Sequence, residues 1–472
     1  MGKTSHFLDL FFNPKSVAVV GASRNKDTVN YFLVSNLVNL GFPGKVYPVN
    51  PNATEIMGLK AYPRVTSIED DVELAVISVP ARITLDIVRD CVAKKVKGVT
   101  IIAGGFSEIG AEGRKTQDEI RQLLQENGIR AIGPNALSPV NSANNFIIGF
   151  SPSASKLPQG GLSFIFQSGL YQPRLNWLLN EFHLNIAKLV DLGNKMDINE
   201  VDALEYLSQD ADTTVIAMHL ESIAGDARRF MRIMQETTQQ KPVIVLKSGR
   251  TTAGAKAAAS HTAAIISSSD TVFDAALKQS GAIRVYGLDE FFDLAKAFEY
   301  LPLPHGNRVA IASFSGGEGV ITTDCAQLNG LELAELGQGT HDRLSQVFPP
   351  WPIPVNPFDV GVSGQFHNFT DVISRFVEVV ADDPGVDCTA VQVGGPAQIV
   401  APSTGNQMLK PYTDLIAKGK PVVVWGMDPP VSNLLAKELE AHRIPVYPSA
   451  ERAVRALGAL WRYKVWRERW SV

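Results

Sequence analysis

The sequence contains little of what marks several common protein classes. Only three of its 472 residues are cysteines, Cys91, Cys325 and Cys388, and their spacing matches neither a disulfide framework nor a metal site. Such sparse cysteine use is typical of a reducing compartment. The formal net charge is −4, which disfavours a nucleic-acid groove or an anionic membrane surface as the main partner.

Long apolar runs are also missing. No stretch reaches the length that a membrane span requires. The opening residues, "MGKTSHFLDLFF", lack the basic segment, apolar core and small-residue cleavage site of a secretory leader, so we expect a cytoplasmic protein. Hydrophobic residues nevertheless make up 45% of the chain, which is ordinary for a well-packed globular protein. The length predicts about two to four domains.

Strand-like runs alternate with amphipathic helical stretches along the chain. This alternation predicts an α/β fold with mostly parallel, doubly wound sheets. The first group of expected strands spans 16–23, 45–50, 74–80, 98–105 and 129–135. A second group follows a polar linker at 151–160 and spans 161–169, 186–193, 213–222 and 241–249. A third group follows a linker at 300–307 and includes 308–319, 388–397 and 420–428.

The second and third groups resemble each other. Each begins with a strand that ends in Ser-Gly, continues with a strand that opens Asp-Thr-Thr or Asp-Cys-Thr, and then has a strand that opens Lys-Pro-Val. We interpret the two groups as a duplication of one flavodoxin-like unit. The expected domains are a Rossmann-like domain at 1–150 and two flavodoxin-like domains at 151–303 and 304–472.

The two copies differ after the Lys-Pro-Val strand. The first copy carries "GAKAAASHTAAIISSSD" (254–270), a run of small side chains with one imidazole, His261, whereas the second passes quickly into a helix. Loops that leave the carboxyl ends of such strands line the ligand crevice. Glu221 ends a neighbouring strand, and a carboxylate bonded to one ring nitrogen would fix the tautomer of His261. Such a histidine can accept a phosphoryl group or act as a general base, and the spacing leaves both open.

A turn after another strand offers an anion site. In "FQSGLYQPRLNWLLNEF" (166–182), a strand is followed by Ser168, Gly169 and an amphipathic helix. Backbone N–H groups at a helix N-terminus bind anions, and a phosphorylated histidine needs such donors. An ordinary helix cap at Ser168 is the alternative.

The first strand ends in a comparable turn, "GASR", in which backbone amides, Ser23 and Arg24 could bind a nucleotide phosphate. A plain strand-to-helix turn is the alternative. Gly21 is the only glycine of the dinucleotide fingerprint that is present, and the second strand ends in "YPVNPN" rather than in an acid. A nicotinamide dehydrogenase is therefore disfavoured.

Taken together, these stretches resemble the α-type subunit of the NDP-forming acyl-CoA synthetases, the superfamily of succinyl-CoA synthetase and ADP-forming acetyl-CoA synthetase. The matching stretches include "VAVVGAS", "GFPGKVYPVNPNATEIMGLKAYP", "LAVISVPA", "GGFSEIGAEG", "IRAIGPN", "DLGNKMDINEVDALEYL", "LESIAGDARRF" and "KPVIVLKSGRTTAGAKAAASHTAA". The resemblance implies a CoA-binding domain, two succinyl-CoA-synthetase-type domains, and an ATP-grasp module on a separate β subunit in an α2β2 assembly.

The resemblance also implies site residues. His261 would carry the phosphoryl group, Glu221 would orient it, and Ser168 and Gly169 would hold the phosphoryl oxygens. The CoA site would be lined by Gly21, Ala22, Ser23, Val79 and Pro80. The implied reaction converts carboxylate, CoA and ATP into acyl-CoA, ADP and phosphate through an acyl phosphate. ATP or ADP would bind with Mg on the partner chain, with no metal on this one, and a mobile loop would carry His261 between two sites.

The sequence departs from the family pattern near these positions. The departures are Ala136, Ser138, Leu170, Tyr171 and Ala263. Arg174 adds a charge that could bind substrate or face solvent. Two alternatives therefore stay open: a CoA-binding regulatory or assembly protein with a non-functional shuttle, and a related acyl or carbamoyl transferase that uses phosphate.

Overall fold

The computed structural model describes residues 6–150, 157–167, 169, 171, 182–262, 270–393, 402–426 and 434–470. The chain divides into two compact units. Unit 1 comprises residues 1–179 and 184–287, and unit 2 comprises residues 180–183 and 288–472. Within the described ranges, no helix is both long and apolar enough to cross a bilayer.

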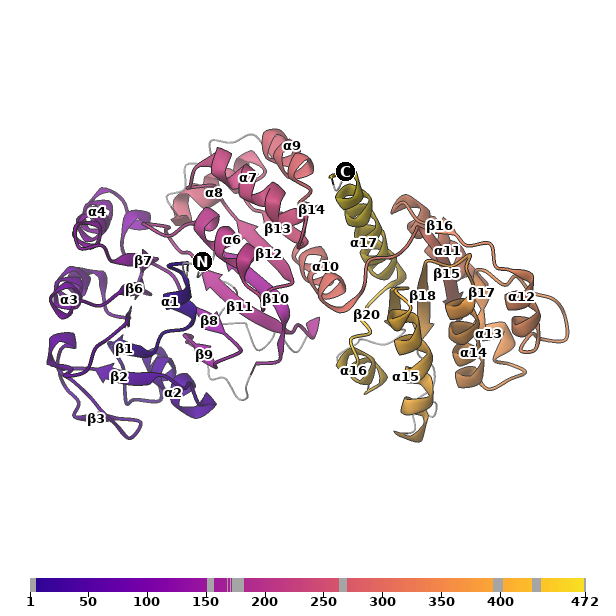
Figure 1. Ribbon diagram of the computed structural model, residues 1–472, viewed down its shortest axis with the longest axis horizontal. Coiled ribbons are helices and arrows are strands. Elements are labelled where there is room, and N and C mark those ends of the chain that lie inside the picture. The colour runs from indigo at the N-terminus through magenta and orange to yellow at the C-terminus, as the bar shows by residue number, and fades with distance from the viewer. Residues whose placement is uncertain are drawn as a thin grey trace, which may run out of the picture. The chain divides into compact units, whose positions relative to one another are not determined.

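The first sheet of unit 1 is parallel and doubly wound, with the strand order β2-β1-β5-β6-β7 (Figure 1). Its strands are β1 (Ser16–Val20), β2 (Lys45–Val49), β5 (Leu74–Ile77), β6 (Gly98–Ile101) and β7 (Arg130–Ile132). Alternate residues of β1 point to opposite faces of the sheet. Val17 and Val19 pack in one hydrophobic core with α2 (Val29–Leu40). Ala18 and Val20 pack in another hydrophobic core with α3 (Ala81–Lys94) and α4 (Ala111–Glu126). Short elements complete this part: α1 (Asp9–Phe12), β3 (Glu55–Ile56), β4 (Leu59–Lys60), η1 (Val65–Ser67) and η2 (Ser107–Ile109).

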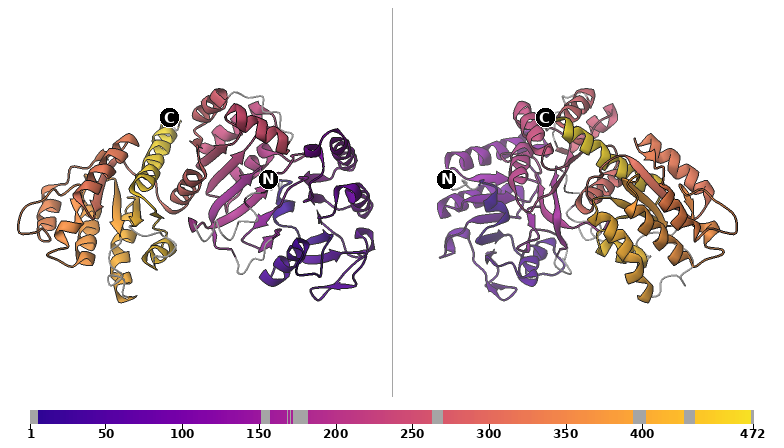
Figure 2. Two further views of the ribbon diagram at one scale, coloured as in Figure 1. Left: turned by 180° about the vertical axis from the view of Figure 1, so that it is seen from behind. Right: turned by 45° about the vertical axis from the view of Figure 1, so that its right-hand side comes forward.

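The second sheet of unit 1 has the order β14-β13-β12-β10-β11-β8-β9. Five strands are parallel: β10 (Gln159–Phe166), β11 (Ile186–Asp191), β12 (Val215–Leu220), β13 (Val243–Lys247) and β14 (Ile283–Val285). The hairpin of β8 (Val140–Asn141) and β9 (Phe146–Ile147) adds antiparallel strands at one edge. Figures 1 and 2 show this sheet in magenta, with its helices packed against it. The helices are α6 (Glu200–Gln209), α7 (Ala227–Thr238), α8 (Thr252–Thr262) and α9 (Asp270–Ser280).

Local sequence explains where these helices begin. Asn199 accepts a hydrogen bond from Val201 N at 2.9 Å, and Asp202 reaches back to Asn199 N at 3.3 Å, which makes a capping box for α6. Asp226 caps α7 in the same way, through the backbone N–H of Arg228 at 2.8 Å.

Unit 2 contains one sheet with the order β16-β15-β18-β19-β20, and β17 (Phe358–Asp359) pairs with β15. Its other strands are β15 (Arg308–Ser313), β16 (Glu332–Leu333), β18 (Cys388–Val393), β19 (Val422–Gly426) and β20 (Val446–Tyr447). One core involves α14 (Phe369–Asp382), α15 (Pro402–Ala417) and α16 (Leu434–Ala441). Outside that core, α11 (Gly316–Leu328) and α17 (Ala450–Trp470) pack on β15, β18 and β19. The remaining helices are α10 (Leu288–Tyr300), α12 (Gln338–Ser345) and α13 (Val360–Ser363).

Counted along the chain, the five main strands of each sheet follow the order 2-1-3-4-5. This is the flavodoxin-like order, and the two duplicated groups share it. The predicted α/β fold is therefore confirmed. The division at 150/151 and 303/304 stays a prediction, and the structure groups α10, which precedes residue 304, with unit 2.

Candidate functional site

Doubly wound sheets bind ligands beyond the carboxyl ends of the strands between which the order reverses. In unit 1, these strands are β1 and β5 of the first sheet and β10 and β12 of the second. The predicted site residues follow these four strands: Gly21, Ala22 and Ser23 after β1, Val79 and Pro80 after β5, Ser168 and Gly169 after β10, and Glu221 after β12. Ser168 lies outside the described residues. The strand order thus gathers the other predicted residues into two groups.

The turns after β1 and β5 touch closely. Gly21 has a φ of +88°, and a Cβ there would lie 2.2 Å from Ser78 O, so a side chain is excluded. Asn30 Nδ2 donates to Gly21 O at 2.8 Å and to Ser78 O at 2.9 Å. This amide therefore holds the two turns together as one backbone cradle.

The cradle offers sites for phosphate but lacks the acid that would bind the ribose of a nicotinamide dinucleotide. Asn50 occupies the end of β2, where a ribose-binding acid would stand, and its Nδ2 donates to Ala22 O at 2.8 Å. Ala22 is buried, Ser23 is half-buried, and the neighbouring Arg24 and Lys26 are exposed cations. Small side chains and nearby positive charge are what a phosphate-bearing ligand requires.

Gln167 organises the second group. Its Oε1 accepts hydrogen bonds from Glu221 N at 2.9 Å, from Ser222 N at 3.1 Å and from Lys195 Nζ at 2.9 Å. The residue is only 4% exposed. The end of β12, which carries Glu221, is therefore fixed to the end of β10.

Lys247 binds the backbone carbonyl of Glu221, whereas Gln167 binds its backbone N–H. Its ammonium donates to Glu221 O at 3.0 Å and to Ser248 O at 2.7 Å. Burial lowers the pKa of Lys247, and the Glu221 carboxylate opposes that lowering, as it does for the pKa of Lys195. The carboxylate of Glu221 is therefore within electrostatic reach of two buried ammonium groups.

A hydrogen-bonded chain lies beside Glu221 that the sequence reasoning missed. The Nδ1 atom of His219 is 2.7 Å from the Tyr171 hydroxyl, and its Nε2 atom bonds to Ser248 Oγ. Burial lowers the pKa of His219 to about 4, and Lys247 adds to the effect. Tyr171 in turn stacks on Phe166, with ring centroids 3.8 Å apart. The departure at Tyr171 thus serves to connect the turn after β10 with the turn after β13.

Asp191, at the end of β11, was also missed. It is buried, and desolvation raises its pKa to about 6, with Glu221 adding to the effect. Leu137 N at 2.9 Å and Gly193 N at 3.1 Å donate to its carboxylate, and Ser138 Oγ donates to its carbonyl at 3.0 Å. A Cβ built on Gly169 would lie 3.9 Å from its Oδ2. A second carboxyl thus borders the turn predicted to hold the phosphoryl group.

The carboxyl edges of the two sheets of unit 1 meet at Asn194. Its Nδ2 donates to Glu108 Oε2 at 2.6 Å, and its backbone N donates to Pro134 O at 2.9 Å. Burial would raise the pKa of Glu108, but the amide of Asn194 and nearby backbone N–H groups lower it instead. The loops after β6 and β7 therefore contact the turn after β11, which also carries Lys195 of the Glu221 group.

His261 lies on α8, and its side chain is outside what the structure describes. The prediction of a loop is wrong for 252–262, because this stretch is helical. Alanine is the strongest helix former, and Thr251 Oγ1 accepts from Gly254 N at 3.0 Å as a cap does. The helix leaves the carboxyl edge after β13 and lies against η2. The partnership of His261 with Glu221 stays a prediction, and Leu170, Arg174 and Ala263 lie outside the described residues.

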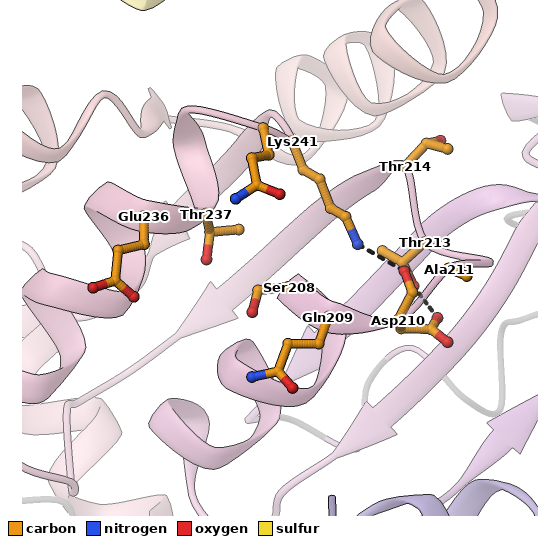
Figure 3. A pocket seen from close by; sticks show the side chains of 10 residues that line it. Ser208, Gln209, Asp210, Ala211, Thr213, Thr214, Glu236, Thr237 and Lys241 are labelled. Atoms are coloured by element: carbon orange, nitrogen blue, oxygen red, sulfur yellow. Dashed lines mark hydrogen bonds between the residues drawn. The ribbon is translucent and has the colours of Figure 1, made fainter. Parts of the chain in front are cut away.

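A hollow of about 620 Å³ opens at the amino ends of β12 and β13, opposite this edge (Figure 3). It is lined by Ser208, Gln209, Asp210, Ala211, Thr213, Thr214, Glu236, Thr237, Gln240 and Lys241. Lys241 Nζ donates to the carbonyls of Leu207 at 2.9 Å and Asp210 at 2.7 Å, which caps the end of α6. Over the described ranges, no group of three His, Cys, Asp or Glu side chains is arranged to hold a metal ion.

Two family models match the chain. Residues 15–140 match a CoA binding domain, and residues 159–298 match a succinyl-CoA ligase like flavodoxin domain. Both lie in the part of the chain that carries the two groups of candidate residues.

Similar proteins cover nearly the whole chain. Subunit α of the ADP-forming acetate–CoA ligase I of Pyrococcus furiosus is 36% identical over 98% of this chain and 98% of its own length. The ADP-forming acetate–CoA ligase II of Archaeoglobus fulgidus is 38% identical over 96% of this chain, which spans only 66% of that relative. The dinucleotide-forming acetyl-coenzyme A synthetase 1 of Ca. Korarchaeum cryptofilum, solved with phosphate and ADP, has a TM-score of 0.88 at 33% identity and covers 98% of this chain and 97% of that chain.

Proposed function

Because the chain belongs to the family of the ADP-forming acetate–CoA ligases, we propose that it is the α subunit of an ADP-forming acyl-CoA synthetase. In this role it is part of an acid–thiol ligase. The reaction is reversible and converts a carboxylate, CoA and ATP into acyl-CoA, ADP and phosphate.

One observation carries the proposal. At the switch point of the second sheet, the main chain of Glu221 is held by Gln167 Oε1 and by the ammonium of Lys247, on the edge from which α8, with His261, departs. Asn194 joins this edge to Glu108 and Pro134, which follow β6 and β7 of the sheet that carries the cradle. These contacts support sites for a CoA thioester and a phosphorylated histidine within one unit.

In the direction of ATP formation, two steps on this chain form the phosphohistidine, which then passes its phosphoryl group to ADP on the partner subunit. Phosphate attacks the thioester carbonyl, the C–S bond breaks, and CoA leaves as the thiol while an acyl phosphate forms. A ring nitrogen of His261 then attacks the phosphorus, the P–O bond breaks, and the carboxylate leaves. Glu221 accepts a hydrogen bond from the other ring nitrogen, and Ser168 and Gly169 bind the phosphoryl oxygens.

The remaining assignments follow the same scheme. Gly21, Ala22, Ser23, Val79 and Pro80 line the CoA site. An ATP-grasp β subunit binds ATP or ADP with Mg in an α2β2 assembly. Two observations support a separate β subunit: the Pyrococcus furiosus relative, of equal length, is named a subunit, and the Archaeoglobus fulgidus relative is longer than this chain. The three free cysteines fit a cytoplasmic location.

The test uses the chain without nucleotide. Incubation with acetyl-CoA and [32P]phosphate should give an acid-labile, base-stable label, which His261→Ala removes. His442→Ala is the matched control, because His442 is an exposed histidine in unit 2, and it should keep the label.

The proposal fails if no label forms with acetyl-CoA, butyryl-CoA or an aromatic acyl-CoA, nor with ATP once an ATP-grasp subunit is added. CoA binding without a phosphoenzyme would instead identify a regulatory protein. Product analysis without nucleotide would reveal an acyl or carbamoyl transferase.

A further inference from the structure

The turn between β11 and α6 has an unusual backbone. Gly193 and Lys195 both have a φ of +54°. An L side chain in this region costs about 1 kcal/mol, so the surrounding structure must hold Lys195 there. The turn places the two side chains that follow Gly193 against different parts of unit 1. Asn194 contacts Glu108, whereas Lys195 enters the Glu221 group.

The ammonium group of Lys195 joins three elements. Its Nζ lies 2.9 Å from Gln167 Oε1, 2.8 Å from Ser222 O and 2.9 Å from Glu200 Oε2. These partners follow β10, follow β12 and begin α6. The side chain is only 3% exposed. One cation therefore fixes the ends of two strands to the start of a helix.

The charge of Lys195 acts beyond its direct partner. Glu200 is fully buried, and its other oxygen accepts from Ala224 N at 2.7 Å and Gly225 N at 3.0 Å. Burial lowers the pKa of Lys195, while Glu200 and Glu221 raise it. Glu221 therefore lies within the field of this ammonium group, and a nearby cation favours the ionised form of a carboxylate.

We propose that Lys195 is a positioning residue of the phosphoryl-transfer site. Through Gln167 and Ser222 it fixes the main chain that carries Glu221, and its charge keeps the Glu221 carboxylate ionised. An ionised Glu221 accepts the hydrogen bond that holds the ring of His261 in one tautomer. The proposal rests on the proposed function, since it assigns Lys195 to the same phosphoenzyme reaction.

Substitution of a lysine with a purely structural role should lower stability and leave the phosphoenzyme reaction unchanged. Lys188 is a matched comparison, because it is another buried lysine of the same sheet and donates to Asp210 at 2.8 Å and to Asp212 at 2.9 Å. It lies near the amino end of β11, at the edge opposite Glu221. Its loss should lower stability without changing the reaction.

The experiment measures the rate of [32P]phosphoenzyme formation from acetyl-CoA and phosphate between pH 5 and 9. In K195M/E200Q, where no buried charge is left unpaired, we expect the rate at pH 7 to fall about 100-fold. The acid limb of the profile should move up by about one pH unit, because Glu221 loses one of two nearby ammonium groups while Lys247 remains. Lys195→Arg keeps the charge, so it should keep the acid limb of the natural chain and recover part of the rate.

The controls separate the possible outcomes. K188M/D210N should keep both rate and acid limb. If the natural chain forms no phosphoenzyme, the proposed function fails. If it does, and K195M/E200Q reacts at the natural rate with an unmoved acid limb, the role of Lys195 is overturned. Should K195M/E200Q fail to fold, Lys195→Arg decides, because an acid limb that moves in this variant contradicts the proposal.

Discussion

The two edges of the second sheet of unit 1 both contain a buried lysine bonded to an acid, but they differ in what surrounds it. At the amino edge, Lys188 is 1% exposed and pairs with Asp210 and Asp212, next to a hollow of about 620 Å³. At the carboxyl edge, Lys195 bonds to the main chain beside Glu221. Lys195 is also paired with an acid, Glu200, so the carboxyl edge differs by the bonds of its lysine to Gln167 and to the main chain beside Glu221. Strand polarity locates the candidate site better than the size of a hollow does.

The largest expected effect is on Glu221. Glu221→Gln should slow phosphoenzyme formation about 1000-fold, because a neutral amide no longer fixes the tautomer of His261 or stabilises its positive charge. Glu236→Gln, an exposed acid that lines the hollow, should leave the rate unchanged. Rapid-quench labelling with [32P]phosphate measures both variants. Equal effects of the two substitutions on the rate would contradict the assignment of the reaction to the carboxyl edge.

Lys188 should matter for stability alone. Lys188→Met leaves Asp210 without its buried cation and should lower the free energy of unfolding by about 3 kcal/mol. Urea denaturation followed by circular dichroism measures the change. A slower phosphoenzyme reaction in the folded variant would show that the amino edge takes part in the chemistry.

Two groups at the carboxyl edge should make opposite contributions to the pH dependence of the free energy of unfolding. The pKa of His219 is lowered to about 4, so the folded state holds its proton less tightly, and stability falls as the pH drops from about 6.5 to 4. The pKa of Asp191 is raised to about 6, so its contribution to stability increases as the pH falls from about 6 to 4. Each contribution is about 3 kcal/mol, and the two oppose each other.

Asp191→Asn removes one of these opposing groups. We therefore expect the variant to lose about 3 kcal/mol more unfolding free energy than the natural chain between pH 6.5 and 4. Urea titrations at pH 6.5 and pH 4 make the comparison. An identical pH dependence in both proteins would mean that Asp191 does not titrate as its burial implies.

Much of this edge could be predicted from the sequence, and the parts that could not have physical reasons. Hydrophobic periodicity located the main strands, and their order placed Gly21 and Glu221 at switch points. The short edge strands β14, β16, β17 and β20 have only two or three residues, too few for a periodic signal. His219 and Asp191 lie in strands buried on both faces, where the pattern does not reveal a polar partner.

Two other features could be recognised only from the backbone conformation in the structure. Lys195 reaches Gln167 only because the turn adopts a left-handed conformation, which the letters "GNK" do not specify. Residues 252–262 appeared featureless, although their alanines favour the helix that forms.

The smallest expected effect concerns the CoA cradle. Gly21→Ala should weaken CoA binding about tenfold, equivalent to about 1.4 kcal/mol, because the new methyl group would strike Ser78 O. Gly58→Ala is the control, since Gly58 also has a positive φ, +76°, but a Cβ there meets nothing within 4 Å. Isothermal titration calorimetry with CoA compares them. Equal losses would mean that backbone strain, and not the contact of the two turns, governs binding.

The central claim is that the carboxyl edge of unit 1 transfers a phosphoryl group through His261. The most direct measurement is mass spectrometry of peptides from the chain after reaction with acetyl-CoA and phosphate under neutral or basic conditions. The account predicts a single phosphorylated peptide that contains His261, with the phosphoryl group on that residue. A phosphoryl group on any other residue, in a chain that turns over acetyl-CoA, would contradict it.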